Sequence, residues 1–253
     1  MIAGRGGLSE TGLWQLVESD GYRTDLDCWS RLASRADGPI LDLGCGIGRV
    51  CHHLNRLGHK THGVDRDPDL VSDFNRTRPL GSPPAVTADA TRLLDPASPL
   101  RGGHFPLVIA PQQLIQILGG RPARLKLFEA LPEIVGPEGT AAFAFCEELP
   151  EVSIHYPEVM PDLREVDEWI YSSQPVAIEP SADSVTAVRL RQSLSPDGTS
   201  SRREDSVTLD RLDRQTVESE LRQAGFLRFD TAPIPETDRH MGSTLLVARP
   251  SAA

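Results

Sequence analysis

The sequence contains no long apolar run and no excess of basic charge. No stretch approaches the ~20 apolar residues that a transmembrane helix needs, and the first 30 residues hold no apolar stretch typical of a signal peptide. The chain has 26 Lys and Arg against 36 Asp and Glu, a net charge of -10, whereas nucleic-acid-binding proteins usually present a basic face. We therefore expect a cytoplasmic protein whose partners are neither a membrane nor a nucleic acid.

Cysteines are also few, and none belongs to a paired motif. The four are Cys28, Cys45, Cys51 and Cys146, and no two of them form a Cys-x-x-Cys pair. That spacing argues against a zinc cluster or a redox motif. We expect reduced thiols and predict no metal site.

The length and composition favour a globular domain. The chain has 253 residues, of which 39% are hydrophobic and 25% are charged. Such a chain buries a sizeable core and is not disordered as a whole. One large α/β domain, or a domain with a small cap, fits this length.

Short apolar runs alternate with amphipathic stretches through the first part of the chain. The runs predict strands, and the stretches between them predict helices from about residues 47–57, 67–75 and 123–135. This alternation is typical of a doubly wound α/β fold with helices on both faces of a parallel sheet. The predicted strands are 40–43, 60–64, a short one near Val86, 107–110, 140–145, 226–230 and 243–248.

Four parts are expected along the chain: a helical N-terminal cap (1–36), a core (37–146), an acidic segment with an antiparallel hairpin (147–210), and a closing part (211–253). Residues 147–170 carry eight acids and one arginine, a net charge of -7. A turn at 195–198 joins the arms of the hairpin, on which Arg189 and Arg191 are expected to face solvent. Asp213 is expected to cap a closing helix that ends at Gly225.

A glycine turn, Gly44-Cys45-Gly46-Ile47-Gly48, lies between the first strand and the first helix of the core. Glycines let the backbone turn sharply and approach a ligand closely, and the helix presents free N–H groups to that ligand. The dinucleotide fingerprint would need glycine at position 49, which is Arg49. A tight connection without any ligand is the alternative interpretation of the turn.

Two carboxylates follow the next two strands. Asp65 ends the second strand, so it is expected at the carboxyl edge beside the glycine turn, where ribose hydroxyls can donate to it. Asp89 and Ala90 follow the third strand and are placed to bond an exocyclic amine and a ring nitrogen of adenine. Taken singly, each acid is more commonly a solvated loop residue.

With these features in order, the sequence resembles the class I S-adenosylmethionine-dependent methyltransferases. The resemblance covers about residues 38–146 and the two closing strands, and rests on Ile40–Arg49, Gly63–Asp65, Ala88–Ala90 and Phe105–Pro111. It implies a seven-stranded, mostly parallel sheet whose last strand is antiparallel. It also implies S-adenosylmethionine as cofactor, S-adenosylhomocysteine as product, and no metal.

The resemblance further implies a set of cofactor-binding residues. The glycine turn would line the methionine part, Asp42 would orient that region, Asp65 would hold the ribose, and Asp89 with Ala90 the adenine. The full set is Tyr22, Asp42, Gly44, Cys45, Gly46, Gly48, Asp65, Arg66, Asp89, Ala90, Pro111 and Gln116.

The fourth motif departs from several branches of this family. Ala110-Pro111-Gln112-Gln113 stands where adenine-N6 and glutamine methyltransferases carry Asn-Pro-Pro-Tyr or Asp-Pro-Pro-Tyr. No Asp-Asn dipeptide marks a catechol-type magnesium site, and no Pro-Cys dipeptide marks a C5-cytosine enzyme. What remains resembles the small-molecule branch, in which a substrate hairpin and an N-terminal cap cover the cofactor.

We therefore expect in-line methyl transfer to an O, N or C nucleophile of a small molecule. The protein is expected to be a monomer or a homodimer. One alternative is a protein or RNA methyltransferase, although the acidic charge counts against RNA. Another is a fold relative that keeps the cofactor as a non-methylating cyclase or binding scaffold. A nucleotide-dependent oxidoreductase is disfavoured by Arg49.

Candidate catalytic residues come from three regions. Gln112, like Gln113 and Gln116, follows the fourth strand, so each lies either in the cleft or on a helix surface. His155, Tyr156 and His240 are candidate bases or gates, although an isolated histidine is more often structural. Two aromatics of the lead-in, Tyr22 and Trp29, either fold over the cofactor or pack in the core. The acidic segment either steers an amine substrate or forms a solvated face.

Overall fold

The computed structural model describes residues 7–156 and 159–250. Contacts within the chain divide it into two units. The core unit comprises Arg23–Glu148 and Leu212–Ala253, and the antiparallel unit comprises Met1–Tyr22 and Leu149–Arg211. Within the described residues, no helix has the length and apolarity needed to cross a membrane.

A seven-stranded sheet forms the centre of the core unit, in the order β11-β12-β5-β4-β1-β2-β3. Strands β1 to β5 pair in parallel, whereas β12 runs antiparallel to both β5 and β11. This arrangement confirms the predicted fold class. The strands are β1 (Ile40–Leu43), β2 (Thr61–Asp65), β3 (Val86–Thr87), β4 (Leu107–Ala110), β5 (Thr140–Phe145), β11 (Phe226–Ile234) and β12 (Ser243–Pro250).

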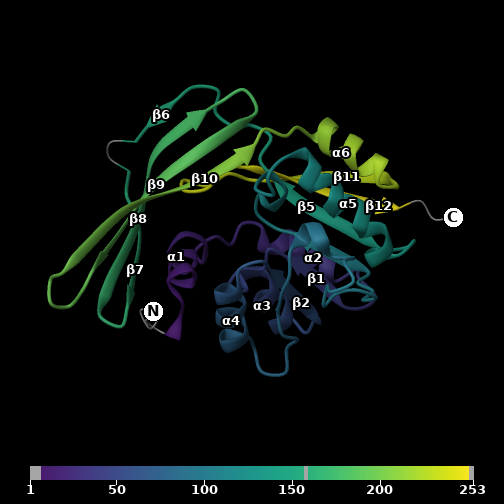
Figure 1. Ribbon diagram of the computed structural model, residues 1–253, viewed down its shortest axis with the longest axis horizontal. Helices are drawn as coiled ribbons and strands as arrows, with labels where there is room; N and C mark the ends of the chain where they lie inside the picture. The colour runs from purple at the N-terminus through teal and green to yellow at the C-terminus, as the bar shows by residue number, and fades with distance from the viewer. Residues whose placement is uncertain (1–6, 157–158, 251–253) are drawn as a thin grey trace. The chain divides into compact units, whose positions relative to one another are not determined.

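Helices cover both faces of this sheet, with α2, α3 and α4 on one face and α5 and α6 on the other (Figure 1). Asp213 caps α6 as predicted, because its carboxylate accepts the Thr216 backbone N–H at 2.7 Å. The helices are α2 (Leu26–Ala33), α3 (Arg49–Arg56), α4 (Pro68–Thr77), α5 (Arg121–Val135) and α6 (Arg214–Gln223), with short 3-10 turns η2 (Ala90–Arg92) and η3 (Leu114–Gln116).

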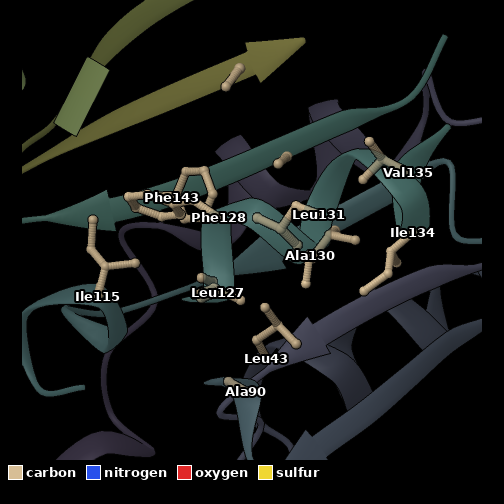
Figure 2. Packing of buried hydrophobic residues seen from close by; sticks show 14 of the residues in the cluster. Leu43, Ala90, Ile115, Leu127, Phe128, Ala130, Leu131, Ile134, Val135 and Phe143 are labelled. Carbon is tan, nitrogen blue, oxygen red and sulfur yellow. The ribbon is translucent and has the colours of Figure 1, made fainter. Parts of the chain in front are cut away.

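The main hydrophobic core lies between the sheet and α5. The apolar stripe predicted for this helix (Leu127, Leu131 and Ile134) is fully buried. Phe128 of α5 meets Phe143 of β5 edge to face, with ring centroids 5.2 Å apart (Figure 2). These contacts fix the strands whose carboxyl ends carry the candidate site.

A buried ion pair joins α5 to α6. The guanidinium of Arg124 donates to both carboxylate oxygens of Glu220, at 3.0 and 3.1 Å. Only 4% of the Arg124 side chain and 2% of Glu220 are exposed. This pair holds the two helices together on one face of the sheet.

The antiparallel unit is a sheet of five strands, β10-β9-β8-β6 with β7 paired to β8. The predicted hairpin is present as β9 and β10, which pair along their length. The sheet is larger than predicted, because β6 and β7 from the acidic region and β8, which follows it, also belong to it. The elements are α1 (Glu10–Ser19), β6 (Ile154–His155), β7 (Asp162–Val166), β8 (Trp169–Pro180), β9 (Ser184–Leu194) and β10 (Ser200–Asp210).

The lead-in does not form the single cap expected for residues 1–36. Its first part, through Tyr22, belongs to the antiparallel unit, and the rest belongs to the core unit. The physical reason is packing: Trp14 of α1 meets Tyr171 of β8 edge to face at 5.5 Å, whereas α2 contacts α3. Helices α1 and α2 therefore belong to different units.

The expectation that Arg189 and Arg191 face solvent is wrong. Arg191 donates to both carboxylate oxygens of Glu18 at 2.7 and 2.8 Å, and its side chain is only 15% exposed. Arg189 donates to Ser173 at 2.8 Å and to Asp162 at 2.5 Å. Helix α1 covers this face of the sheet, so both arginines are held in ion pairs beneath it.

Candidate active site

Three predicted cofactor residues of the core unit and the catalytic candidate Gln112 come from neighbouring strand ends. Gly44 follows β1, Asp65 is the last residue of β2, Asp89 follows β3, and Gln112 follows β4. Because these strands are parallel, their carboxyl ends meet at one edge of the sheet. The structure therefore brings these four positions to the same edge.

The glycine turn has the backbone conformation that only glycine adopts easily. Its three glycines have φ of +66, +54 and +97°. A Cβ atom would lie 2.9 Å from the Leu114 side chain at Gly44, and 2.5 Å from the His52 ring at Gly48. Gly48 is also the N-cap of α3 and offers no side-chain acceptor. The turn therefore depends on glycine, and the N–H groups of Cys45, Gly46 and Gly48 are bonded to Val64, Asp65 and Cys45.

The Asp65 carboxylate is bonded to the glycine turn. Its Oδ2 accepts the Gly46 backbone N–H at 2.9 Å, and its Oδ1 accepts the Asp67 N–H at 3.0 Å. The residue is 9% exposed. Each carboxylate oxygen has two lone pairs, so Asp65 can hold the turn and still accept from ribose hydroxyls.

Asp89 begins the short turn η2. Its Oδ1 accepts from the backbone N–H and the hydroxyl of Thr91, both at 2.8 Å. The side chain is exposed, whereas the neighbouring Ala90 is buried. Arg66, directly after β2, is exposed as well. This arrangement leaves Asp89 accessible to an adenine amine.

Asp42 is a buried acid directly before the glycine turn, and 1% of it is exposed. Its Oδ1 has no hydrogen-bond partner among the described residues. Burial raises the pKa of this carboxyl to about 8, against the opposing effect of the Arg49 guanidinium; the charges of Asp65 and Asp25 add to the rise, and the Cys51 backbone N–H lowers it. A buried orphan oxygen calls for a partner, and a positively charged ligand group would supply one.

Comparison with known proteins agrees with this geometry. Residues 40–139, which span the glycine turn and both acids, match the family model described as "Methyltransferase domain". These residues form a methyltransferase domain. No curated protein sequence matches the chain.

Solved structures share the fold around the methyltransferase domain. The sugar N-methyltransferase KedS8 from Streptoalloteichus sp ATCC 53650 is 14% identical with a TM-score of 0.72, covering 99% of this chain and 96% of that one. CalS10, an amino pentose methyltransferase from Micromonospora echinaspora, is 15% identical with a TM-score of 0.68, covering 94% and 96%. CcbJ from Streptomyces caelestis is 20% identical with a TM-score of 0.67, covering 92% and 98%. At these identities the likeness establishes the fold.

Sequence reasoning missed an ion pair beside the glycine turn of the methyltransferase domain. Arg49, the first residue of α3, donates to both carboxylate oxygens of Asp25. Trp29 donates its indole N–H to the same carboxylate at 2.8 Å and is fully buried. The packing interpretation of Trp29 therefore holds. The only signal in the sequence was the spacing of Asp25 and Trp29, one helical turn apart.

The loop after β4 of the methyltransferase domain is held by its glutamines. Gln112 has a left-handed backbone with φ of +45°, which is uncommon outside glycine. The Gln113 amide donates to the Cys146 thiol at 3.2 Å and to the Ser243 hydroxyl at 3.3 Å. Pro111 is buried. Strained residues are commonly found at functional sites, which supports a role for Gln112.

Gln116 does not fit its predicted role as a cofactor ligand. It is 1% exposed. Its side-chain oxygen accepts the Cys146 N–H at 2.8 Å, and its amide nitrogen donates to the Cys146 carbonyl at 3.0 Å. The side chain bonds the backbone just beyond the end of β5 and so holds η3 against the sheet.

The remaining candidates lie elsewhere in the chain. His240 is in the loop between β11 and β12, with its Nδ1 3.4 Å from the Thr237 hydroxyl. His155 is exposed on β6, and the backbone N–H of Tyr156 bonds to Val176 at 3.0 Å. Tyr22 is 7% exposed. Tyr22, His155 and Tyr156 belong to the antiparallel unit, and their roles, like that of His240, stay predictions.

Metal ligands are not grouped in the part of the chain that the structure describes. Among residues 7–156 and 159–250, no three His, Cys, Asp or Glu side chains are arranged to hold an ion.

Proposed function

We propose that this protein transfers a methyl group from S-adenosylmethionine to an amine of a small molecule. One observation carries the cofactor assignment: Asp65 holds the glycine turn from one side while Asp42, beside it, keeps a buried oxygen without a partner. The match of residues 40–139 to a methyltransferase domain supports the same reaction.

The residues present fit the cofactor in three places. The glycine turn would accommodate its methionine part, and Asp42 would face a positively charged group there. Asp65 would accept from the ribose hydroxyls, and Asp89 with Ala90 would contact the adenine. When bound, the cofactor supplies a methyl group already activated by the sulfonium.

The chain itself has to position the acceptor and exclude water. Correct alignment of two reacting groups is worth ~7–11 kcal/mol. Gln112 lies at the carboxyl end of β4 with its backbone fixed in a left-handed conformation. Its side-chain carbonyl is able to accept an N–H of the acceptor and so to orient the nitrogen lone pair.

An amine is the acceptor that the molecule favours. The segment 147–170 carries a net charge of -7 in the sequence and would attract a cation. Two proteins of similar structure are described as a sugar N-methyltransferase and an amino pentose methyltransferase. An amine nitrogen also carries its own nucleophilic lone pair once neutral, whereas a hydroxyl acceptor depends more on a base.

Ligand binding tests the cofactor. We expect S-adenosylmethionine and S-adenosylhomocysteine, but not NAD, to raise the melting temperature, because a ligand that binds the native state stabilises it. Stabilisation by NAD alone would instead favour an oxidoreductase. Binding without methylation of any acceptor in a panel of amino sugars and their hydroxyl analogues would favour a non-methylating relative. Methylation of the hydroxyl analogues alone would contradict the amine assignment.

Asp65→Ala tests the ribose contact. We expect the affinity for S-adenosylhomocysteine, measured by calorimetry, to fall by ~1–3 kcal/mol, because hydrogen bonds to charged groups are of that size. Asp69→Ala is the control, since Asp69 is an exposed acid in the first turn of α4. Equal affinities in the two variants would remove the role from Asp65.

A further inference from the structure

A buried, bidentate ion pair joins the start of α2 to the start of α3. Nη1 and Nη2 of Arg49 lie 2.6 and 2.7 Å from Oδ1 and Oδ2 of Asp25. The two side chains are 8% and 1% exposed. The Trp29 indole N–H donates to the same carboxylate at 2.8 Å. Three donors therefore fix the orientation of one carboxylate.

The position of Arg49 links this ion pair to the glycine turn. Arg49 directly follows Gly48, which has a left-handed backbone, and it begins α3. The ring of His52, one turn further along the helix, fills the space over Gly48. A guanidinium bonded at both nitrogens thus fixes the first turn of α3, which directly follows the glycine turn.

Stability alone does not account for the pair. Removing two charges from water is costly, and apolar replacement of buried ion pairs is often neutral or stabilising. Helix α2 already has an apolar face to dock with, since Leu26, Cys28, Trp29 and Ala33 are all buried. The ion pair adds a fixed geometry that apolar contacts between α2 and α3 would not impose.

We propose that Asp25 and Arg49 are positioning residues that hold the glycine turn in its cofactor-binding shape. The inference rests on the proposed function, because the affinity for the cofactor is what the pair would set. Neither residue needs to touch the cofactor, since both act through Gly48 and the first turn of α3.

The test compares three variants of the full chain by their affinity for S-adenosylhomocysteine: Asp25→Asn, Arg49→Met and the double variant. Calorimetry is done below each variant's melting transition, so that only folded protein is measured. We expect each single variant to lose at least tenfold in affinity. The double variant should lose no more than Arg49→Met, because the two residues act as one unit.

Arg49→Lys separates geometry from charge. Lysine keeps the positive charge but cannot bond both carboxylate oxygens as a planar fork. A positioning role predicts that the affinity stays at least severalfold below that of the wild type. Full affinity in this variant would mean that charge alone matters, and would overturn the proposal.

The matched control is another buried ion pair of the core unit, Arg124–Glu220, which joins α5 to α6. Glu220→Gln removes a carboxylate as buried as that of Asp25. It should lower the melting temperature and leave the affinity of the folded protein within twofold of the wild type. If Asp25→Asn and Arg49→Met behave in the same way, the pair is merely structural and the proposal is wrong. A wild-type chain that binds no S-adenosylhomocysteine would overturn the proposed function and this inference with it.

Discussion

At the scale of single residues, Asp42 makes the stability of the ligand-free protein depend on pH. Its folded-state pKa is raised from 3.8 to about 8, with burial as the main cause. Between these values the folded state keeps a proton that the unfolded state loses. Unfolding therefore releases a proton, and the free energy of unfolding contributed by Asp42 falls as pH rises from about 4 to about 8.

Asp42→Asn should remove this contribution. Each pKa unit corresponds to ~1.4 kcal/mol, so the stability gain of the variant over the wild type should grow from about 2 kcal/mol at pH 5 to about 5 kcal/mol at pH 8. Urea denaturation of both proteins at several pH values measures the difference. Parallel stability profiles would contradict the raised pKa of Asp42.

Gly48 and Gly58 offer a matched pair of substitutions. Both have a left-handed backbone, with φ of +97 and +94°. A Cβ at Gly48 would meet the His52 ring at 2.5 Å, whereas nothing lies within 4 Å at Gly58. Alanine at either site should cost ~1 kcal/mol or more for the backbone strain.

Only Gly48→Ala should also weaken binding of S-adenosylhomocysteine, because the clash displaces the start of α3. Thermal melts and calorimetry on the two variants check both expectations. Equal binding by both would show that the position of the start of α3 does not matter for the cofactor.

At the scale of elements, Glu18 docks α1 on the antiparallel sheet. Its carboxylate accepts from Arg191 at 2.7 and 2.8 Å and from Ser173 at 2.6 Å. Burial raises the pKa of Glu18, but these hydrogen bonds, together with the charges of Arg191 and Arg189, lower it further, so the net shift is downward. The stability that this carboxylate contributes is therefore present at neutral pH and is lost as pH falls through its folded-state pKa.

Glu18→Gln should loosen α1 from the sheet by ~1–3 kcal/mol. Faster hydrogen exchange of the α1 amides at neutral pH would show this. The control is Glu10→Gln on the same helix, whose ion pair with Arg203 is half exposed on both sides and should contribute little. Equal exchange rates in the two variants would contradict the docking role of Glu18.

The strands of the core were predictable because their signals are local. Ile40–Leu43 is a short apolar run followed by a glycine turn, and Asp65 is fixed by the strand that precedes it. Strand β8 (Trp169–Pro180) was missed because prolines interrupt it and acids precede it. The turn before β8 has positive φ at Asp167 and Glu168, a pair that lacks the glycine of the usual hairpin signals.

Contacts between distant segments were beyond sequence reasoning. Arg49 and Asp25 are 24 residues apart, and Arg191 and Glu18 are 173 apart. An arginine in an alternating strand is indistinguishable from a solvated one until the covering helix is known. The cofactor role predicted for Gln116 was wrong for a related reason. Its side chain bonds the backbone of Cys146, and because every residue has a backbone, the sequence does not mark such a partner.

At the scale of the whole molecule, the net charge of -10 is unevenly distributed along the chain. Residues 147–170 hold most of the excess, with a net charge of -7. An acidic region raises the local concentration of a cationic acceptor and speeds its encounter with the protein. Salt screens this effect, because the Debye length falls from ~30 Å at about 0.01 M to ~10 Å at about 0.1 M ionic strength.

We expect kcat/KM for the amine acceptor found in the methylation panel to fall severalfold over this salt range, while that for a neutral analogue stays nearly flat. Glu151→Gln with Glu165→Gln, both exposed in the acidic segment, should lower kcat/KM at low salt and flatten the profile. Glu129→Gln with Glu133→Gln, exposed on α5, changes the net charge equally and should leave the profile as in the wild type. Identical profiles for the two double variants would mean that net charge, rather than this segment, attracts the acceptor. A salt-independent wild type would show that the segment is only a solvated face.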